Sequence, residues 1–284
     1  MIENTFCHVP GIGPKLERQL WDSGLLSWRD ALDSDSLPLG PRRADALKAS
    51  LDDSIHHLDD GDIAYFYRHI PTAQQWRLFP HFRHTLAYFD IETTGLRALD
   101  DYITTIVLYD GASLQHYVQD DNLDDFGDDL APYRLIVTFN GKSFDAPFVR
   151  TYMGVAVDQA HIDLRYVLAS LGYRGGLKGC ERRLGIAREG AEDIDGYFAV
   201  LLWFDYHRNG NERALETLLA YNAMDVVNLE SLMVTAYNLH LEHTPFASTH
   251  RLPLPLQPHI PFRPDAETIG RLKGELNSYS PSYY

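Results

Sequence analysis

The chain has few cysteines and no long hydrophobic run. Among its 284 residues only Cys7 and Cys180 are cysteine, and neither lies in a Cys-x-x-Cys pair or a Cys/His cluster. Two isolated thiols exclude a disulfide framework and a cysteine-based zinc site, and they favour a reducing compartment. No window is apolar enough to cross a bilayer, and the N-terminus lacks the basic start and apolar stretch of a secretory signal. We therefore expect a cytoplasmic protein without membrane contact.

Positive charge is also scarce, with 25 Lys and Arg against 40 Asp and Glu and a formal net charge of −15. This deficit argues against a strongly basic nucleic-acid-binding protein, because affinity for phosphates comes largely from Lys and Arg. It does not exclude nucleic acid, since carboxylates that hold metal ions still count as negative in the formal charge. The acidic run "QDDNLDDFGDD" can equally be a solvated face remote from any substrate.

The pattern of the chain predicts an α/β protein in four parts. Residues 1–62 are expected to form a small all-helical domain, and residues 63–84, with Pro71 and Pro80 as helix breakers, a connecting segment. Residues 85–244 predict a mixed β-sheet flanked by helices, and residues 245–284 a proline-rich tail that is extended or disordered. Four strands are expected, at residues 85–93, 102–111, 113–119 and 134–141.

The stretch "LAYFDIETTGL" places Asp90 and Glu92 on an otherwise apolar strand. Residues two apart on a strand point to the same face, and burying both charges unpaired would cost roughly several kcal/mol each. A divalent cation between them would remove that cost. The absence of nearby Cys and His indicates Mg²⁺ or Mn²⁺ rather than zinc. A solvated edge strand would leave the same pattern.

Two later segments supply further acidic candidates. In "VTFNGKSFDAPFV" a strand ends, a glycine turn follows, and Asp145 stands at the start of a helix, where Asp also serves as an N-terminal cap. In "AYNAMDVVNL", Tyr221 and Asp225 lie four apart on a strongly periodic helix and therefore share one face. The alternative is that both lie at the edge of an apolar stripe.

Together, Asp90, Glu92, Asp145 and Asp225 with Tyr221 resemble, in order and setting, the tyrosine-bearing DEDDy branch of the DEDD exonucleases, which have a ribonuclease H-like fold. Between about Tyr67 and His243, the segments "HIDLRYVLASLG", "LKGCERRLGI", "EDIDGYFAVLLW" and "YNAMDVVNLESL" are similar to the YprB-like subgroup of ribonuclease H-like proteins. The resemblance implies two Mg²⁺ or Mn²⁺ ions held by the four carboxylates, with Tyr221 orienting a water or assisting its deprotonation. It also implies hydrolysis from a 3′ end that releases nucleoside 5′-monophosphates.

Other residues are weaker candidates for contact with nucleic acid. Thr93 and Thr94 are expected to place donors near the terminal nucleotide, and Leu96 to wedge against its base. Asn140 and Lys142 are expected to touch the substrate backbone, or else to be ordinary turn residues. The run "YRGGLKGCERR" is either a phosphate-facing patch or a solvated helix face. His161, Asp163 and Asp195 match the subgroup without an assigned role.

The N-terminal stretch "VPGIGPKLERQL" resembles a helix-hairpin-helix motif. Gly11 and Gly13 would let the backbone approach a phosphate, which N–H groups at the start of the following helix and Lys15 would hold. A plain turn or a protein contact would have the same sequence. Arg42 and Arg43 mark a degenerate second hairpin.

The sequence therefore predicts a metal-dependent 3′→5′ exonuclease with two Mg²⁺ or Mn²⁺ ions. The helix-hairpin-helix resemblance favours DNA, single-stranded or 3′-ended, and RNA is the near alternative. A structure-specific endonuclease using the same site and a non-catalytic nucleic-acid-binding scaffold are the remaining hypotheses.

Overall fold

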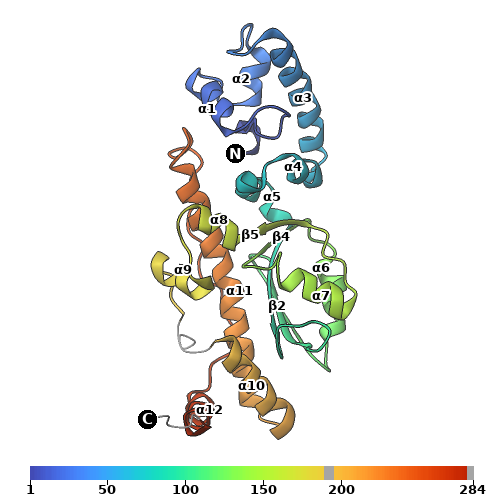
Figure 1. Cartoon of the computed structure of the whole chain (residues 1–284), viewed down its shortest axis with the longest axis vertical. Helices are drawn as coiled ribbons and strands as arrows, with labels where there is room; N and C mark the ends of the chain where they lie inside the picture. The colour runs from blue at the N-terminus through green and yellow to red at the C-terminus, as the bar shows by residue number, and fades with distance from the viewer. Residues whose placement is uncertain (189–194, 280–284) are drawn as a thin grey trace.

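The computed structural model describes residues 1–188 and 195–279 of the chain. The molecule is elongated: α1 to α3 lie at one end of its long axis, the sheet lies in the middle, and α12 lies near the other end (Figure 1). Within the described residues, every helix is too short or too polar to cross a membrane.

The N-terminal region is all-helical, as predicted. Two of its helices, α1 and α3, have a proline in the first turn, where a backbone N–H would have no helical partner. In α2, Ser27 and Asp30 form a capping box. The elements of this region are η1 (Ile2–Asn4), α1 (Pro14–Asp22), α2 (Trp28–Asp33), α3 (Pro41–Asp59) and α4 (Ile63–His69).

A buried ion pair attaches this region to the rest of the chain. Glu17 of α1 is fully buried, and its carboxylate accepts hydrogen bonds from the backbone N–H of Phe6 at 2.7 Å and from Arg77 Nη1 at 2.8 Å. Arg77 lies in the 3₁₀ helix η2 (Thr72–Leu78). Removing one partner of such a pair leaves the other charge buried and uncompensated.

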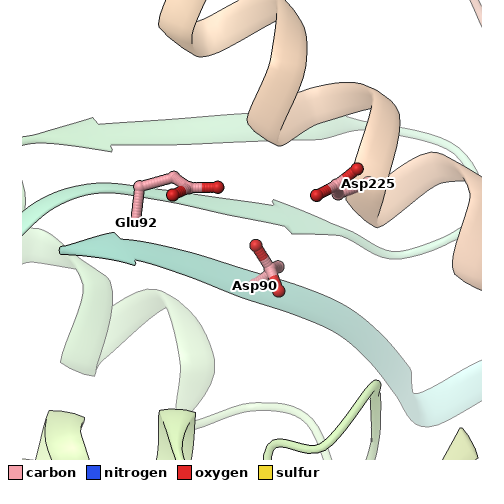
Figure 2. Close-up of side chains that lie close together, drawn as sticks. All are labelled: Asp90, Glu92 and Asp225. Atoms are coloured by element: carbon pink, nitrogen blue, oxygen red, sulfur yellow. The ribbon is translucent and has the colours of Figure 1, made fainter. Parts of the chain in front are cut away.

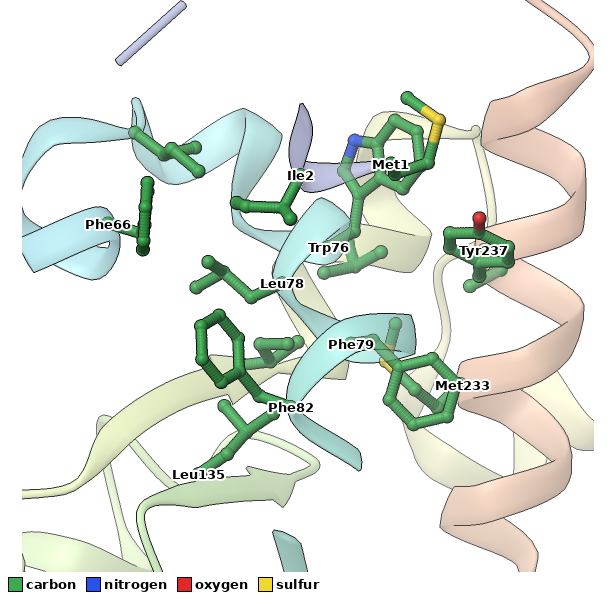
Figure 3. Packing of buried hydrophobic residues seen from close by; sticks show 14 of the residues in the cluster. Met1, Ile2, Phe66, Trp76, Leu78, Phe79, Phe82, Leu135, Met233 and Tyr237 are labelled. Carbon is green, nitrogen blue, oxygen red and sulfur yellow. The ribbon is translucent and has the colours of Figure 1, made fainter. Parts of the chain in front are cut away.

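The predicted connecting segment is helical and part of the core. Pro71 stands between the end of α4 and the start of η2 and so separates two helices, as predicted. Pro80 lies in the first turn of α5 (Phe79–Phe82), where it starts a helix and does not break one. A further 3₁₀ helix, η3 (Arg83–Thr85), leads into the sheet. Figure 3 shows that Trp76 and Phe79 of this segment lie toward α11, where Tyr237 and Met233 are. Leu78 and Phe82 lie on the other side of the segment, with Phe66 and Leu135.

The sheet has five strands in the order β3-β2-β1-β4-β5. The first three are antiparallel neighbours, and the last two run parallel to β1. Four of the strands were predicted. The fifth, Ala160–Asp163, was missed because it runs directly into α8 and, unlike the equally short Leu135–Thr138, is not a run of apolar and β-branched residues. The strands are β1 (Leu86–Thr93), β2 (Ile103–Tyr109), β3 (Leu114–Val118), β4 (Leu135–Thr138) and β5 (Ala160–Asp163).

Helices cover both faces of the sheet, as predicted. The 30-residue α11 (Glu212–Leu241) lies along one face, and the shorter α6 and α7 lie on the other (Figure 1). Alternate residues of β1 serve the two sides: Tyr88 packs in the same cluster as Val226 and Leu229, whereas Phe89 and Ile91 pack in the cluster of α6 and α7. The remaining elements are η4 (Leu123–Asp125), α6 (Phe126–Leu130), α7 (Asp145–Met153), α8 (Leu164–Ser170), α9 (Gly176–Leu184) and α10 (Gly196–Asn209).

The C-terminal part is only partly the extended tail that the sequence predicts. Residues 251–260 have no regular structure and lie against α11, where Asn238 exchanges two hydrogen bonds with the backbone of Leu252. Helix α12 (Ala266–Tyr279), which was not predicted, follows and docks through an ion pair between Arg271 and Asp205. Residues 280–284 of the predicted tail, and residues 192–194 of the "EDIDG" motif, lie outside the described residues.

Candidate active site

Three carboxylates from two elements meet on the α11 face of the sheet. Because side chains alternate along β1, Asp90 and Glu92 point away from the Phe89 and Ile91 side and toward α11. Asp225 comes from the middle of α11 and faces them (Figure 2). One oxygen from each of the three carboxylates lies within 4.8 Å of the others, and this is the group that could hold a metal ion among the described residues.

The centre is buried and its charges repel one another. Glu92 and Asp225 are buried, whereas Asp90 is half-buried. Burial, followed by repulsion from Asp145, Asp225 and Glu92, raises the pKa of Asp90 well above its usual value. Burial, followed by repulsion from Asp225 and Asp145, does the same to the pKa of Glu92. A divalent cation at this point would stabilise the ionised form of all three side chains.

The fourth predicted carboxylate, Asp145, lies beside this group but is not one of the three whose oxygens lie within 4.8 Å of one another. It is the first residue of α7, as predicted, but Phe144 and not Asp145 is the N-cap. Asp145 Oδ1 accepts a hydrogen bond from the backbone N–H of Ile91 at 3.2 Å, between the two β1 carboxylates in sequence. Burial raises the pKa of Asp145 to about 7, although hydrogen bonds from backbone N–H groups oppose the shift.

Asn222 fixes the orientation of Asp90. Its Nδ2 donates to Asp90 Oδ2 at 2.9 Å, and its Oδ1 accepts from the Thr105 hydroxyl at 3.1 Å; Asn222 and Thr105 are fully buried between α11 and the sheet. The sequence analysis missed this residue. The signal was present: a polar amide three residues before Asp225 on a predominantly apolar helix shares the face of that carboxylate.

Arg188 neutralises part of the acidic centre. One guanidinium nitrogen donates to Asp225, and the other donates to Glu181 Oε2 of α9 at 2.6 Å. Glu181 is fully buried and also accepts from Asn228 Nδ2 at 2.8 Å. Burial raises the pKa of Asp225, and the charge and hydrogen bond of Arg188 oppose that shift. Nothing local in the sequence distinguished Arg188, since its partners lie on two other segments.

Tyr221 stands beside these groups with two cations over its ring. It is buried, with Lys178 Nζ at 4.9 Å and Arg188 Cζ at 5.5 Å from the ring centroid. Burial, followed by the charges of Asp225, Glu92 and Asp90, raises the pKa of the Tyr221 phenol. In this environment the hydroxyl stays protonated and is available as a hydrogen-bond donor.

The hydroxyls of Thr93 and Thr94 form hydrogen bonds within the loop that follows β1. Thr93 Oγ1 donates to the Gly95 carbonyl at 2.6 Å, and Thr94 Oγ1 donates to Asp101 at 3.4 Å. Both hydroxyls therefore stabilise the loop. Leu96, by contrast, is 84% exposed and Leu99 is 90% exposed, so the loop presents apolar side chains to solvent next to the carboxylates on β1.

Asp163, to which the sequence analysis assigned no role, stabilises the turn after β4. Its carboxylate accepts from the backbone N–H of Asn140 at 2.8 Å and of Lys142 at 3.1 Å, and it caps α8 through the N–H of Arg165. The Lys142 ammonium donates to Gln75 at 3.4 Å, in the connecting segment. In this structure the two turn residues have the structural contacts expected of ordinary turn positions.

The two other residues without an assigned role also have structural contacts. His161 Nε2 is buried 2.8 Å from the Thr138 hydroxyl, and Asp195 caps α10 by accepting from the N–H of Phe198. Burial lowers the pKa of His161 to about 3, so its ring is neutral.

The N-terminal glycine turn lies away from the carboxylates. Gly11 has a φ of +84°, which glycine adopts without strain, and Gly13 is the N-cap of α1. Lys15 is exposed in the first turn of this helix. Since α1 lies at one end of the molecule (Figure 1), the structure does not bring these three residues to the acidic centre.

Comparison with known proteins gives one family match and several relatives. A family model described as RNase_H superfamily matches residues 87–237, which include the four predicted carboxylates and Tyr221. Uncharacterized protein YprB of Bacillus subtilis (strain 168) is 31% identical over 176 residues, which are 54% of this chain and 42% of YprB. The chain therefore spans less than half the length of that relative.

Two solved structures are also similar. Brucella melitensis NrnC has 19% sequence identity and a TM-score of 0.39, with 72% of this chain and 93% of that chain covered. The family B DNA polymerase from the hyperthermophilic archaeon Pyrobaculum calidifontis has 14% identity and a TM-score of 0.35, with 55% of this chain and 29% of that chain covered.

Proposed function

Because the chain belongs to the RNase H superfamily, we propose that it is a metal-dependent 3′→5′ exonuclease that hydrolyses phosphodiester bonds of nucleic acid. The observation that carries the proposal is the convergence of Asp90, Glu92 and Asp225, from a strand and a helix far apart in sequence, on one buried point. Arg188 offsets only one of these charges, and a divalent cation would allow all three carboxylates to stay ionised near neutral pH. The preferred substrate is single-stranded or 3′-ended DNA, which the glycine turn and exposed Lys15 of α1 would help to hold.

The residues present fit Mg²⁺ or Mn²⁺. The donor set is made of carboxylate oxygens, which these hard cations prefer. The carboxylates also repel one another, and a bound cation would offset that repulsion. Asp90, Glu92 and Asp225 would hold the ions, with Asp145 beside them. When bound, the ions would supply a water that is nucleophilic near neutral pH and would stabilise charge on the departing 3′ oxygen.

The other residues would orient these groups and the substrate. Asn222 and Arg188 fix the directions of Asp90 and Asp225, so the carboxylates need little rearrangement to bind cations. The Tyr221 hydroxyl, protonated in the metal-free chain, would orient the attacking water through a hydrogen bond or assist its deprotonation. Leu96 would meet the base of the terminal nucleotide. The product would be a nucleoside 5′-monophosphate.

The test is a time course on matched 5′-labelled single-stranded DNA and RNA with Mg²⁺ or Mn²⁺. The intact chain is compared with Asp90→Asn and Asp225→Asn, and with Asp124→Asn, which removes the same charge at an exposed position. We expect a ladder that shortens from the 3′ end, faster on DNA, in the intact chain and in Asp124→Asn only. Failure of the well-folded intact chain to cleave either substrate would refute the proposal, and a single internal cut would replace it with an endonuclease.

A further inference from the structure

Lys178 is a cation beside the acidic centre that makes no hydrogen bond to Asp90, Glu92 or Asp225. Lys178 lies on α9, and its ammonium stands 4.9 Å from the centroid of the Tyr221 ring. It is near enough to the carboxylates that its charge lowers the pKa of Glu92 and of Asp225, against the larger effect of burial. Helix α9 therefore brings a positive charge to the side of the centre on which Tyr221 lies.

Lys178 differs from its neighbour Arg188 in what it contacts. The Arg188 guanidinium is engaged by Glu181 and Asp225. Within residues 1–188 and 195–279, the structure shows the Lys178 ammonium over an aromatic ring and in no hydrogen bond or ion pair of its own. The side chain is half-buried, and burial together with the Arg188 charge lowers its pKa. A partly desolvated ammonium without a direct anionic partner is poised to receive one.

The charges of the site indicate which anion would fit. Two divalent ions would balance the four carboxylates Asp90, Glu92, Asp145 and Asp225, and Glu181 already balances Arg188. A phosphodiester that enters the site beside Tyr221 would add a negative charge that none of these groups offsets. The Lys178 ammonium has the sign and the position to offset it.

We propose that Lys178 binds the phosphate of the 3′-terminal nucleotide, which is the scissile phosphate before cleavage and the 5′-phosphate of the released nucleotide after it. The inference rests on the proposed function and adds to it a substrate-binding residue. Of the basic run "YRGGLKGCERR", the structure brings Lys178 to the centre, whereas Arg174 and Arg182 are exposed and Arg183 donates to the Gly172 carbonyl.

The test measures binding of thymidine 5′-monophosphate to the whole chain at saturating Mn²⁺, by calorimetry, with thymidine as the ligand that lacks the phosphate. The variants are Lys178→Ala, Lys178→Arg and, as the matched control, Arg182→Ala, which removes one exposed positive charge from the same helix. We expect Lys178→Ala to weaken the affinity for thymidine 5′-monophosphate about tenfold or more, as loss of a charge-assisted hydrogen bond does. Lys178→Arg should keep most of the affinity, and Arg182→Ala all of it.

A titration with Mn²⁺ alone separates a phosphate contact from an effect on the metal site. Lys178→Ala should bind Mn²⁺ at least as tightly as the intact chain, because a positive charge has been removed. Equal affinity of Lys178→Ala and the intact chain for thymidine 5′-monophosphate would overturn the proposal, as would a loss of Mn²⁺ binding that accounts for the change. The readout does not require turnover: binding through Lys178 without any cleavage of DNA or RNA would refute the exonuclease and leave the phosphate site standing.

Discussion

Asn222 donates a hydrogen bond to Asp90 across 2.9 Å, from a helix 132 residues further along the chain. The same side chain accepts from Thr105 on the neighbouring strand β2. One amide therefore ties α11 to two strands and sets the direction in which a predicted metal ligand points.

Replacing this amide should weaken metal binding as well as the fold. In Asn222→Leu, Asp90 and Thr105 each lose a buried partner, which should lower the free energy of unfolding by about 1–3 kcal/mol. Because Asp90 is then free to turn, the affinity for Mn²⁺ measured by calorimetry should also fall. The control is Asn238→Leu, which removes the two hydrogen bonds to Leu252 from the same helix and should cost stability without changing the affinity for Mn²⁺. Unchanged Mn²⁺ binding in Asn222→Leu would contradict this role.

Replacing Arg188 alone should destabilise the fold more than replacing it together with Glu181. Arg188→Met leaves Glu181 fully buried and without its positive partner, so the free energy of unfolding in EDTA should fall by about 3–5 kcal/mol. The double variant Glu181→Gln, Arg188→Met removes both charges and should recover a large part of that loss. Chemical denaturation of the three chains measures the difference. Equal stability of the single and double variants would contradict the view that unpaired Glu181 causes the loss of stability in Arg188→Met.

Without metal, the stability of the chain should depend on pH in the direction opposite to ordinary acid denaturation. Burial raises the pKa of Asp145 from 3.8 to about 7, so its folded state holds a proton that its unfolded state has released. Its contribution to the free energy of unfolding is therefore favourable near pH 4 and is lost as the pH rises toward 7. Asp90 and Glu92, whose pKa values are also raised, add to the same trend.

Thermal unfolding from pH 5 to pH 8 in EDTA checks this dependence. Asp145→Asn should lose less stability across that range than the intact chain, and excess Mn²⁺ should flatten the curve of the intact chain. At a concentration of 100 times the Kd, the ion should add about 2.7 kcal/mol. Parallel pH curves for the intact chain and Asp145→Asn would rule out Asp145 as a source of the trend.

Gly141 should not tolerate a side chain. A Cβ at this position would lie 2.2 Å from the Thr138 hydroxyl oxygen and 2.6 Å from Thr138 Cβ, in the turn that precedes Asp145. Gly141→Ala should therefore destabilise the chain and shift α7, with a loss of Mn²⁺ affinity. Gly270→Ala is the control: this helical glycine of α12 has nothing within 4 Å of the added atom, and the substitution should gain up to about 1 kcal/mol. Thermal unfolding compares the two, and similar melting temperatures would contradict the predicted clash.

The sequence predicted the parts of the centre that depend on local periodicity. Asp90 and Glu92 were identified as sharing a face because strand alternation has a period of two, and Tyr221 and Asp225 because the helix around them is long and regular. The antiparallel strands β2 and β3 were predicted within residues 102–111 and 113–119.

What the sequence did not reveal depends on packing between distant segments. Arg188 acquires its partners only when α9 and α11 lie side by side, and no spacing in the chain encodes that contact. Strand β5 continues directly into α8 and was therefore taken as part of that helix, and α12 was missed because it follows a proline-rich run. Pro80 was predicted to break a helix, whereas it lies in the first turn of α5, a position that proline favours.

The distance in sequence between Asp90 and Asp225 has a consequence for the time at which the centre is formed. During synthesis β1 and its two carboxylates are translated before α11, so they emerge well ahead of Asp225. Until then the nascent polypeptide has an incomplete set of ligands and no site for a cation. The acidic centre can therefore form only after α11 has followed β1 out of the ribosome, and every shorter nascent chain lacks one of its three carboxylates.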